Sequence, residues 1–257
     1  MAGKPLIVVT NDDGIFSKGI KALIEVASEF GELLIVAPDK PQSGMGHAIT
    51  VNNIIRVEED PLHAEYNSYS CTGTPVDCIK VARYLLCDRV PDLVVSGINH
   101  GANTGTSVLY SGTMSAAVEG AIERIPSVGF SLDSFDSIAD FDVAREVAYR
   151  IIKKMMNSLS HLPQDICLNV NIPAIPVEQL KGIKVCRAAK AYWKDELDER
   201  LDQHGRKYYW LSGEFENNDL GEDTDLFAIK NNYASVVPIH YDMTAYHWMS
   251  TINNWDI

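Results

Sequence analysis

The sequence predicts an α/β protein with a doubly wound, mostly parallel, Rossmann-like sheet that carries helices on both faces. Two observations support this prediction. Short, continuous apolar runs, such as residues 6–9 and 33–37, are typical of strands that are buried on both faces of a parallel sheet. Through about residue 188, these runs alternate with segments whose apolar residues recur at the three-and-four spacing of amphipathic helices.

The remaining core elements follow the same alternation. Apolar runs predict strands over residues 93–95, 127–132 and 166–172, and imperfect alternation predicts a strand over 49–57 that pairs with 65–70. Helical spacing predicts helices over residues 20–30, 75–85, 112–125 and 141–155. Ligands of such sheets gather at the carboxyl ends of the strands, so the residues that follow the strands are the first candidates for a site.

The chain changes character after Arg187. Residues 191–213 are rich in charged and aromatic side chains, and the segment 202–205 predicts a hairpin turn between strands at 196–201 and 207–211. A short helix from Thr224 and a brief strand at Val236-Val237 follow. We therefore expect a catalytic core over residues 1–188 and a C-terminal extension over residues 189–257.

The tail at residues 241–257 carries large apolar side chains, including Trp248, Met249 and Trp255. Because such side chains are costly to leave in water, we expect the tail to dock onto a partner subunit. The alternative is that it folds back on its own domain, and the sequence is compatible with both arrangements.

Composition excludes several classes of partner. The formal charge is −13, from 35 acidic and 22 basic residues, so the overall field repels nucleic-acid polymers and anionic membranes. A small phosphate ester can still bind where a cation or backbone amides offset the charge locally. The five cysteines form no CxxC pair and are odd in number, which predicts reduced core thiols in a cytoplasmic protein. The sequence contains neither a signal peptide nor a run long enough to span a membrane.

Two adjacent carboxylates follow the first predicted strand. Asp12 and Asp13 repel each other there, and an oxygen-preferring divalent cation such as Mg²⁺ or Mn²⁺ would relieve this repulsion. The alternative is an ordinary Asp-Gly turn ending at Gly14. After the second strand, Ser43 offers a hydroxyl to a metal or a phosphate, although serine also forms plain turns, and His47 is expected to satisfy local hydrogen bonds.

A glycine- and asparagine-rich loop joins the strand at 93–95 to a helix that begins after Ser111. Ser111 is a good N-cap, but Met114 stands where a capping box needs glutamate, so amides of the first turn remain for an outside anion. Gly112 lets a ligand approach the backbone. The loop matches neither GxGxxG nor a P-loop, so the alternative is a loop without a ligand.

Several separate blocks, in order, are similar to those of the SurE (survival protein E) family of metal-dependent 5′-nucleotidases. The resemblance extends over nearly the whole chain. The blocks are Thr10-Asn11-Asp12-Asp13-Gly14, Ala37-Pro38-Asp39 with Gln42-Ser43-Gly44, Gly73-Thr74-Pro75, Ser96-Gly97-Ile98-Asn99 with Gly101 and Asn103, and Tyr110-Ser111-Gly112-Thr113 running to Glu119-Gly120.

The resemblance implies a site and an activity. It implies one divalent cation per subunit, Mg²⁺ or Mn²⁺, bound by Asp12, Asp13, Ser43 and Asn99. It also implies a site for the phosphate of the substrate, formed by Asn103, Ser111, Gly112 and Thr113. It further implies a cytoplasmic phosphomonoesterase acting on nucleoside 5′-monophosphates, in some members also on 3′-phosphates or short polyphosphate. Members are homodimers or homotetramers that exchange C-terminal segments, which agrees with the interpretation of the tail.

The catalytic carboxylates, Asp12 and Asp13, can act in two ways. They can hold a cation that activates a water, or one of them can attack phosphorus directly and form an aspartyl-phosphate. A haloacid-dehalogenase-type phosphatase is a rival, but its chemistry needs Asp-x-Asp, and Asn11-Asp12-Asp13 does not provide it. A non-catalytic module that senses a nucleotide is the other alternative.

Overall fold

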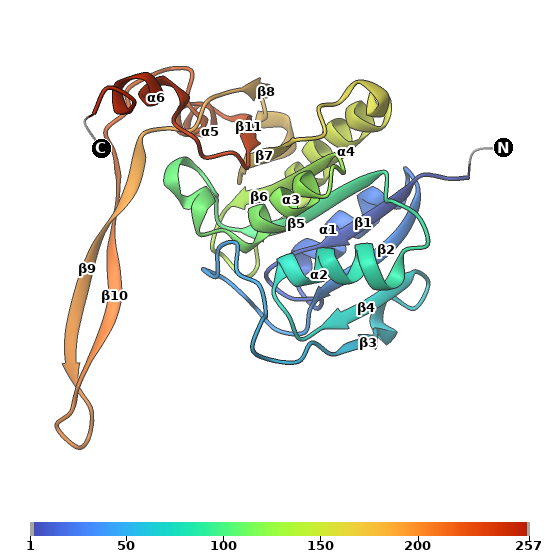
Figure 1. Ribbon diagram of the computed structural model, residues 1–257, viewed down its shortest axis with the longest axis horizontal. Helices are drawn as coiled ribbons and strands as arrows, with labels where there is room; N and C mark the ends of the chain where they lie inside the picture. Colours follow the sequence, from blue (N-terminus) through green and yellow to red (C-terminus); the bar gives the residue numbers. More distant parts are fainter. Residues whose placement is uncertain (1–2, 256–257) are drawn as a thin grey trace.

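A nine-stranded sheet forms the centre of the molecule in the computed structural model, which describes residues 3–255 (Figure 1). Its strand order is β3-β4-β2-β1-β5-β6-β7-β11-β8. The strands are β1 (Leu6–Thr10), β2 (Glu32–Pro38), β3 (Val57–Glu59), β4 (Asn67–Cys71), β5 (Leu93–His100), β6 (Ser127–Asp133), β7 (Ile166–Pro173), β8 (Gly182–Val185) and β11 (Tyr233–His240). From β4 to β7 all neighbours are parallel, whereas β3 and β11 run antiparallel to β4 and β7, so the predicted mostly parallel sheet is confirmed.

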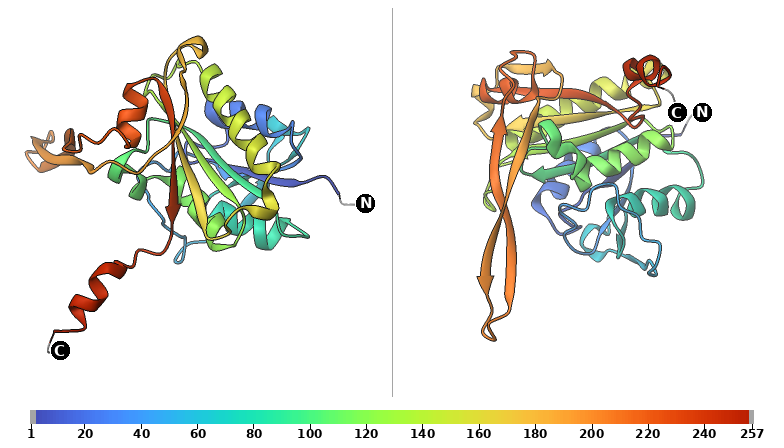
Figure 2. Two further views of the ribbon diagram at one scale, coloured as in Figure 1. Left: turned by 90° about the horizontal axis from the view of Figure 1, so that it is seen from above. Right: turned by 60° about the vertical axis from the view of Figure 1, so that its left-hand side comes forward.

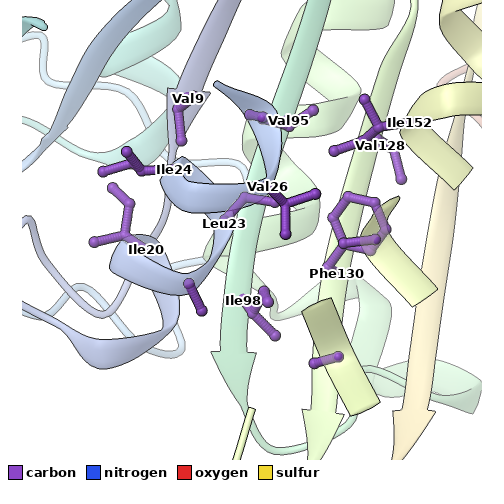
Figure 3. Packing of buried hydrophobic residues seen from close by; sticks show 14 of the residues in the cluster. Val9, Ile20, Leu23, Ile24, Val26, Val95, Ile98, Val128, Phe130 and Ile152 are labelled. Carbon is purple, nitrogen blue, oxygen red and sulfur yellow. The ribbon is translucent and has the colours of Figure 1, made fainter. Parts of the chain in front are cut away.

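Helices cover both faces of this sheet, as predicted. Alternate side chains of β1 belong to different apolar clusters: Val9 packs with helices α1 and α4, and Val8 packs with α2 and α3. The helices are α1 (Lys18–Ala27), α2 (Pro75–Val81), α3 (Gly112–Ile122), α4 (Asp142–Met156), α5 (Asp225–Lys230) and α6 (Tyr246–Ile252). Figure 3 shows the larger cluster, in which Leu23 and Val26 of α1 lie over the central strands. Burial of each such side chain contributes about 1.5–3 kcal/mol.

The strand predicted over residues 49–57 is wrong except at its end. Only Val57–Glu59 forms a strand, and it pairs with Asn67–Cys71 as expected. Residues 49–56 are irregular, and Val51 is 74% and Ile54 70% exposed. Their apolar alternation resembles a strand, but side-chain bonds to Asp77 and Thr72 fix this segment instead.

The C-terminal part leaves the sheet and returns to it. After β8, strands β9 (Ala191–Leu201) and β10 (Lys207–Asn217) form the predicted hairpin, which extends as a long arm (Figures 1 and 2). Helix α5 then leads into β11, which is longer than the brief strand expected at Val236-Val237 and lies between β7 and β8. The segment beyond residue 188 therefore contributes a strand to the central sheet, while the proposed division into two regions stays a prediction.

Helix α6 extends away from the sheet in the left view of Figure 2, and all its residues are exposed. The tail thus does not fold back on its own domain over residues 246–252. The five cysteines are free thiols, as predicted. Within residues 3–255, every helix is too short or too polar to cross a membrane.

Candidate active site

The end of β1 meets the start of α3. Asp12 is only 3% exposed, and the Thr113 hydroxyl in the first turn of α3 donates a hydrogen bond to its carboxylate. A Cβ atom on Gly112 would lie 2.6 Å from the Cβ atom of Asp12, so glycine is what allows this approach. The predicted N-cap is confirmed, since the Ser111 hydroxyl accepts the Met114 N–H at 3.1 Å.

The environment of Asp12 disfavours its charged form. Burial raises the pKa of Asp12 to about 6, the Thr113 hydroxyl opposes this rise, and the charge of Asp13 adds to it. A buried carboxylate with a raised pKa and a carboxylate neighbour is suited to a cation, which would compensate the lost solvation.

The loop that carries Ser43 is fastened to this centre at two points. The Gln42 N–H donates to the Asp12 carbonyl oxygen at 2.7 Å, and the Gly46 N–H donates to the Tyr110 carbonyl oxygen at 3.1 Å. A third contact follows at His47, whose Nε2 lies 2.9 Å from Glu119 Oε2 in α3. His47 thus forms a hydrogen bond as predicted, but with a residue 72 positions away and not a local one.

Glu119 is buried and also bonds to Lys80. Burial raises the pKa of Glu119, but the bonds from His47 and Lys80 outweigh it, so the pKa lies below its usual range. The carboxylate is therefore held in its charged form by hydrogen bonds from His47 and Lys80.

Asn99 reaches the site because β5 is irregular just before it. Between Ser96 and Asn99 the register with β6 shifts by one residue, which marks a β-bulge. The Asn99 side-chain NH₂ group donates to the Gly101 carbonyl oxygen at 2.8 Å, so its side-chain oxygen is not used in this bond. Asp13 accepts the His100 N–H at 3.2 Å, so the second carboxylate lies beside the end of the same strand.

Asn103 is held by a buried polar network. Its N–H donates to Asn171 Oδ1 at 2.6 Å, and its side-chain amide donates to Ser131 Oγ at 2.8 Å. Asn169 donates to the Asn103 carbonyl oxygen at 2.8 Å. The loop that follows β5 is therefore anchored to β6 and β7.

One cavity of about 820 Å³ brings most of the predicted residues together. Those that line it are Asp12, Ser43, Asn99, Asn103 and Ser111. The other three lie next to it, since Gly112 and Thr113 touch Asp12 and Asp13 touches His100, which is a lining residue. A second hollow of about 600 Å³, beside Arg187 and Asp219, contains none of them.

Sequence reasoning missed the rest of the wall. The additional lining residues include His100, Thr106, Tyr110, Phe135, Tyr192, Trp193, Asp195 and Ser212. His100 directly follows Asn99 at a strand end, and that position could have indicated it. Tyr192 and Trp193 belong to the hairpin, and no local pattern indicates that the base of a hairpin lies over this edge of the sheet.

The predicted metal ligands are suited to a hard cation. Two carboxylates, a hydroxyl and an amide oxygen are the donors that Mg²⁺ and Mn²⁺ prefer. Within residues 3–255, no three or more His, Cys, Asp or Glu side chains gather to hold a metal, so any such site would depend on Ser43 and Asn99 as well. The raised pKa of the buried Asp12 fits this donor set.

Comparison with known proteins identifies the family of this chain. The family described as "Survival protein SurE" matches residues 7–195, which is most of the chain. The chain belongs to the SurE family. The resemblance stated from the sequence is therefore confirmed.

Relatives within the SurE family match over nearly their full length. A protein of Cytophaga hutchinsonii named 5′-nucleotidase SurE is 53% identical over 251 residues, covering 97% of this chain and 96% of the relative. Another of that name, from Flavobacterium psychrophilum, is 51% identical over 255 residues, covering 99% and 98%. The crystal structure of the SurE protein from Aquifex aeolicus superposes with a TM-score of 0.84 at 39% identity, covering 97% and 98%.

Proposed function

We propose that this chain is a 5′-nucleotidase, a metal-dependent phosphomonoesterase that hydrolyses nucleoside 5′-monophosphates to nucleoside and phosphate. The observation that carries the proposal is the contact between buried Asp12 and the first turn of α3, inside a cavity of about 820 Å³. The relatives at 53% and 51% identity, both named 5′-nucleotidase SurE, support the same activity.

The phosphate group would lie at the start of α3. A helix N-terminus attracts anions through its free amides and its partial positive charge. The Ser111 hydroxyl and the side-chain amide of Asn103 line this part of the cavity and can donate to phosphoryl oxygens as charge develops on them, while the one proton of the Thr113 hydroxyl is donated to Asp12. Gly112 lets Asp12 approach this helix start, because a Cβ atom there would lie 2.6 Å from the Asp12 Cβ atom.

The metal would be held by Asp12, Asp13, Ser43 and Asn99. When bound, a Mg²⁺ or Mn²⁺ ion would supply positive charge to the phosphoryl group and acidify an attacking water. The Thr113 hydroxyl keeps the Asp12 carboxylate oriented toward the cavity. The chain's own part is to hold two carboxylates that repel each other side by side, Asp12 buried and Asp13 partly exposed.

The aromatic residues of the cavity suit a nucleoside. The cavity is lined by four aromatic residues, Tyr110, Phe135, Tyr192 and Trp193. Aromatic side chains stack on any nucleobase, whichever hydrogen-bonding groups the base carries. The same cavity therefore offers a polar end for the phosphate and aromatic surface for the base.

Phosphate release decides between the proposal and its rivals. We expect release of phosphate from AMP and GMP with Mn²⁺ or Mg²⁺, and its loss with EDTA and in Asp12→Ala. If AMP binds but no phosphate appears with any divalent cation, the protein is a nucleotide sensor. If a phosphorylated aspartate is trapped in a single turnover, the carboxylate rather than water attacks phosphorus.

The C-terminal segment is proposed to form a homodimer or homotetramer. Helix α6 has no buried residue, and exposed apolar side chains follow one another there, including Trp248, Met249 and Ile252. Patches of this kind on a single chain mark interaction surfaces.

A further inference from the structure

We propose that Asp225 is a positioning residue of the nucleotidase site: it fixes the loop that carries Asn103 against the base of the hairpin. This inference rests on the proposed function and assigns Asp225 no contact with the substrate. Asp225 is 0% exposed and stands in the first turn of α5, outside the residues that line the cavity.

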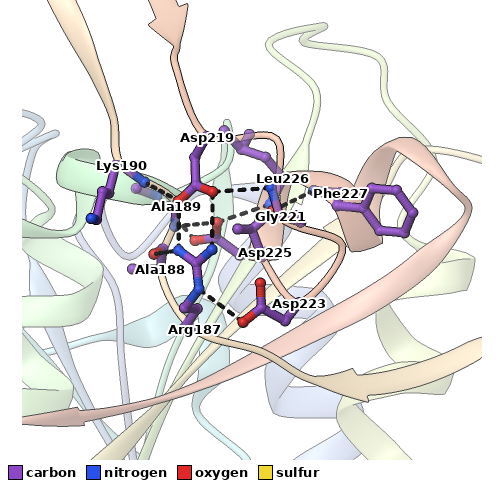
Figure 4. Close-up of polar contacts among 12 residues, drawn as sticks. Arg187, Ala188, Ala189, Lys190, Asp219, Gly221, Asp223, Asp225, Leu226 and Phe227 are labelled. Atoms are coloured by element: carbon purple, nitrogen blue, oxygen red, sulfur yellow. Dashed lines mark hydrogen bonds and ion pairs between the residues drawn. The ribbon is translucent and has the colours of Figure 1, made fainter.

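The carboxylate of Asp225 joins three segments of the chain. Its Oδ2 accepts the Gly105 N–H at 3.0 Å, across 120 residues of sequence. Its Oδ1 accepts the Ala189 N–H at 2.9 Å and the Leu226 N–H at 2.8 Å. Figure 4 shows this side chain among the segments that lead into and out of the hairpin. Buried carboxylates that accept several N–H bonds hold their donors firmly.

Both segments that Asp225 fastens lead directly into walls of the cavity. Gly105 lies two residues after Asn103, and the next residue, Thr106, is itself a lining residue. Ala189 lies three residues before Tyr192, in the approach to β9. The Asp225 side chain therefore sets the distance between the loop that carries Asn103 and the hairpin segment that carries Tyr192.

The loop and the hairpin are pressed together at this point. A Cβ atom on Gly105 would lie 2.8 Å from the Ala191 carbonyl oxygen, and its φ of +54° also favours glycine. The Thr106 hydroxyl donates to the same oxygen at 3.0 Å. Asn103 is tied to β7 on its other side, so release at Asp225 would free only the hairpin side of the loop.

A second cluster holds the hairpin without touching the loop. Arg187 donates to Asp219 Oδ1 at 2.9 Å and to Asp223 Oδ2 at 2.9 Å (Figure 4). The Lys190 N–H donates to Asp219 Oδ2 at 3.0 Å. Asp219 thus joins both ends of the hairpin but makes no bond to Gly105, which makes Asp219→Asn a matched control.

Asp225→Asn separates the bond to the Gly105 loop from the bonds to Ala189 and Leu226. Asparagine has the same shape but one oxygen, which can keep the two bonds from Ala189 and Leu226. Its NH₂ group then faces the Gly105 N–H, a second donor, so that this bond is lost. An unpartnered buried N–H is costly, and the loop is expected to shift.

The test compares the kinetics of AMP hydrolysis at saturating Mn²⁺. We expect Asp225→Asn to raise KM roughly tenfold while kcat stays within about twofold, because the loop and the hairpin wall contact the nucleotide before and during the reaction alike. The Mn²⁺ concentration for half-maximal activity should stay unchanged, and Asp219→Asn should keep the KM of the wild type. A lower Tm is expected in either case, because the bond to Gly105 is lost. A merely structural role would reduce kcat with an unchanged KM, and that result would overturn the proposal.

A measurement on the wild type covers the case in which Asp225→Asn does not fold. Hydrogen exchange at the Gly105 amide should be as slow without AMP as in the strands of the sheet. Fast exchange that slows only after AMP is added means that the nucleotide, not Asp225, orders the loop. A wild type that releases no phosphate from AMP with any divalent cation refutes the proposed function, whereas an active wild type with an unaffected variant refutes only the role of Asp225.

Discussion

Asp12 and Thr113 lie 101 residues apart in the chain, and the Thr113 hydroxyl donates a hydrogen bond to the Asp12 carboxylate. The contact joins the end of strand β1 to the first turn of helix α3, which follows the neighbouring strand β5 in the chain. Such an edge combines a carboxylate for a cation with amides for an anion. The predictions that follow test this pairing and the surfaces around it.

In the metal-free protein, Asp12 is expected to make the folded state less stable as pH rises. Burial raises its pKa from 3.8 to about 6, so the unfolded chain loses this proton at lower pH than the folded protein does. Stability should therefore fall between about pH 4 and pH 6, by about 3 kcal/mol. Urea unfolding of EDTA-treated Asp12→Asn, which cannot ionise there, should show no such loss. Parallel stability curves for the two proteins would contradict the assignment.

Added Mn²⁺ is expected to stabilise the wild type. At a free concentration one hundred times Kd, the gain should be about 2.7 kcal/mol. Asp12→Asn and Asn99→Ala should lose most of it, because each removes a proposed ligand. Thermal unfolding with and without Mn²⁺ measures this, and Asp223→Asn, an exposed carboxylate paired with Arg187, serves as the control. An equal shift in the Asp12 variant would rule out the proposed site.

Gly112→Ala is expected to lose both stability and activity. The added Cβ atom would lie 2.6 Å from Asp12, forcing the carboxylate away from α3, at a cost of about 1–3 kcal/mol. Gly120→Ala is the matched control in the same helix, since its Cβ atom would lie 2.1 Å from Ser127 Oγ, far from the cavity. Gly112→Ala should lower both the free energy of unfolding and kcat/KM, whereas Gly120→Ala should lower only the free energy of unfolding. Full activity of Gly112→Ala would refute the close approach.

Removal of the tail is expected to reduce the oligomeric state. A chain that ends after residue 240 lacks α6 and its exposed Trp248 and Met249. Sedimentation velocity should give a dimer or tetramer for the full chain and a smaller species after truncation. Tyr84→Ser, which removes an exposed aromatic side chain elsewhere, should change nothing. A monomeric wild type would contradict the docking proposal.

The sequence allowed the sheet and the start of α3 to be predicted because their signals are local. The apolar run at β1 indicates a strand that is buried on both faces, and Ser111 followed by Gly112 indicates a helix N-terminus. Residues 49–56 show the limit of this reasoning. They alternate like a strand, but a strand also needs a partner edge, and here the chain is tied to Asp77 instead.

The hairpin side of the site could not be predicted in the same way. Residues 191–217 do form a hairpin, as their turn signal indicates. Their position over the cavity depends on Asp225 and Gly105, which come together only in the folded chain. The polar residues Asn169 and Asn171 in β7 were the available hint, since polar side chains inside a buried strand need partners.

The hairpin arm begins at Ala191 and ends at Asn217, and these two residues are direct partners in its antiparallel ladder. The spacing of adjacent strands, about 4.8 Å, therefore sets the gap that any substitute for this arm has to bridge. An arm from a relative, or a short linker in its place, can be grafted there as a cassette without altering the order of the remaining strands.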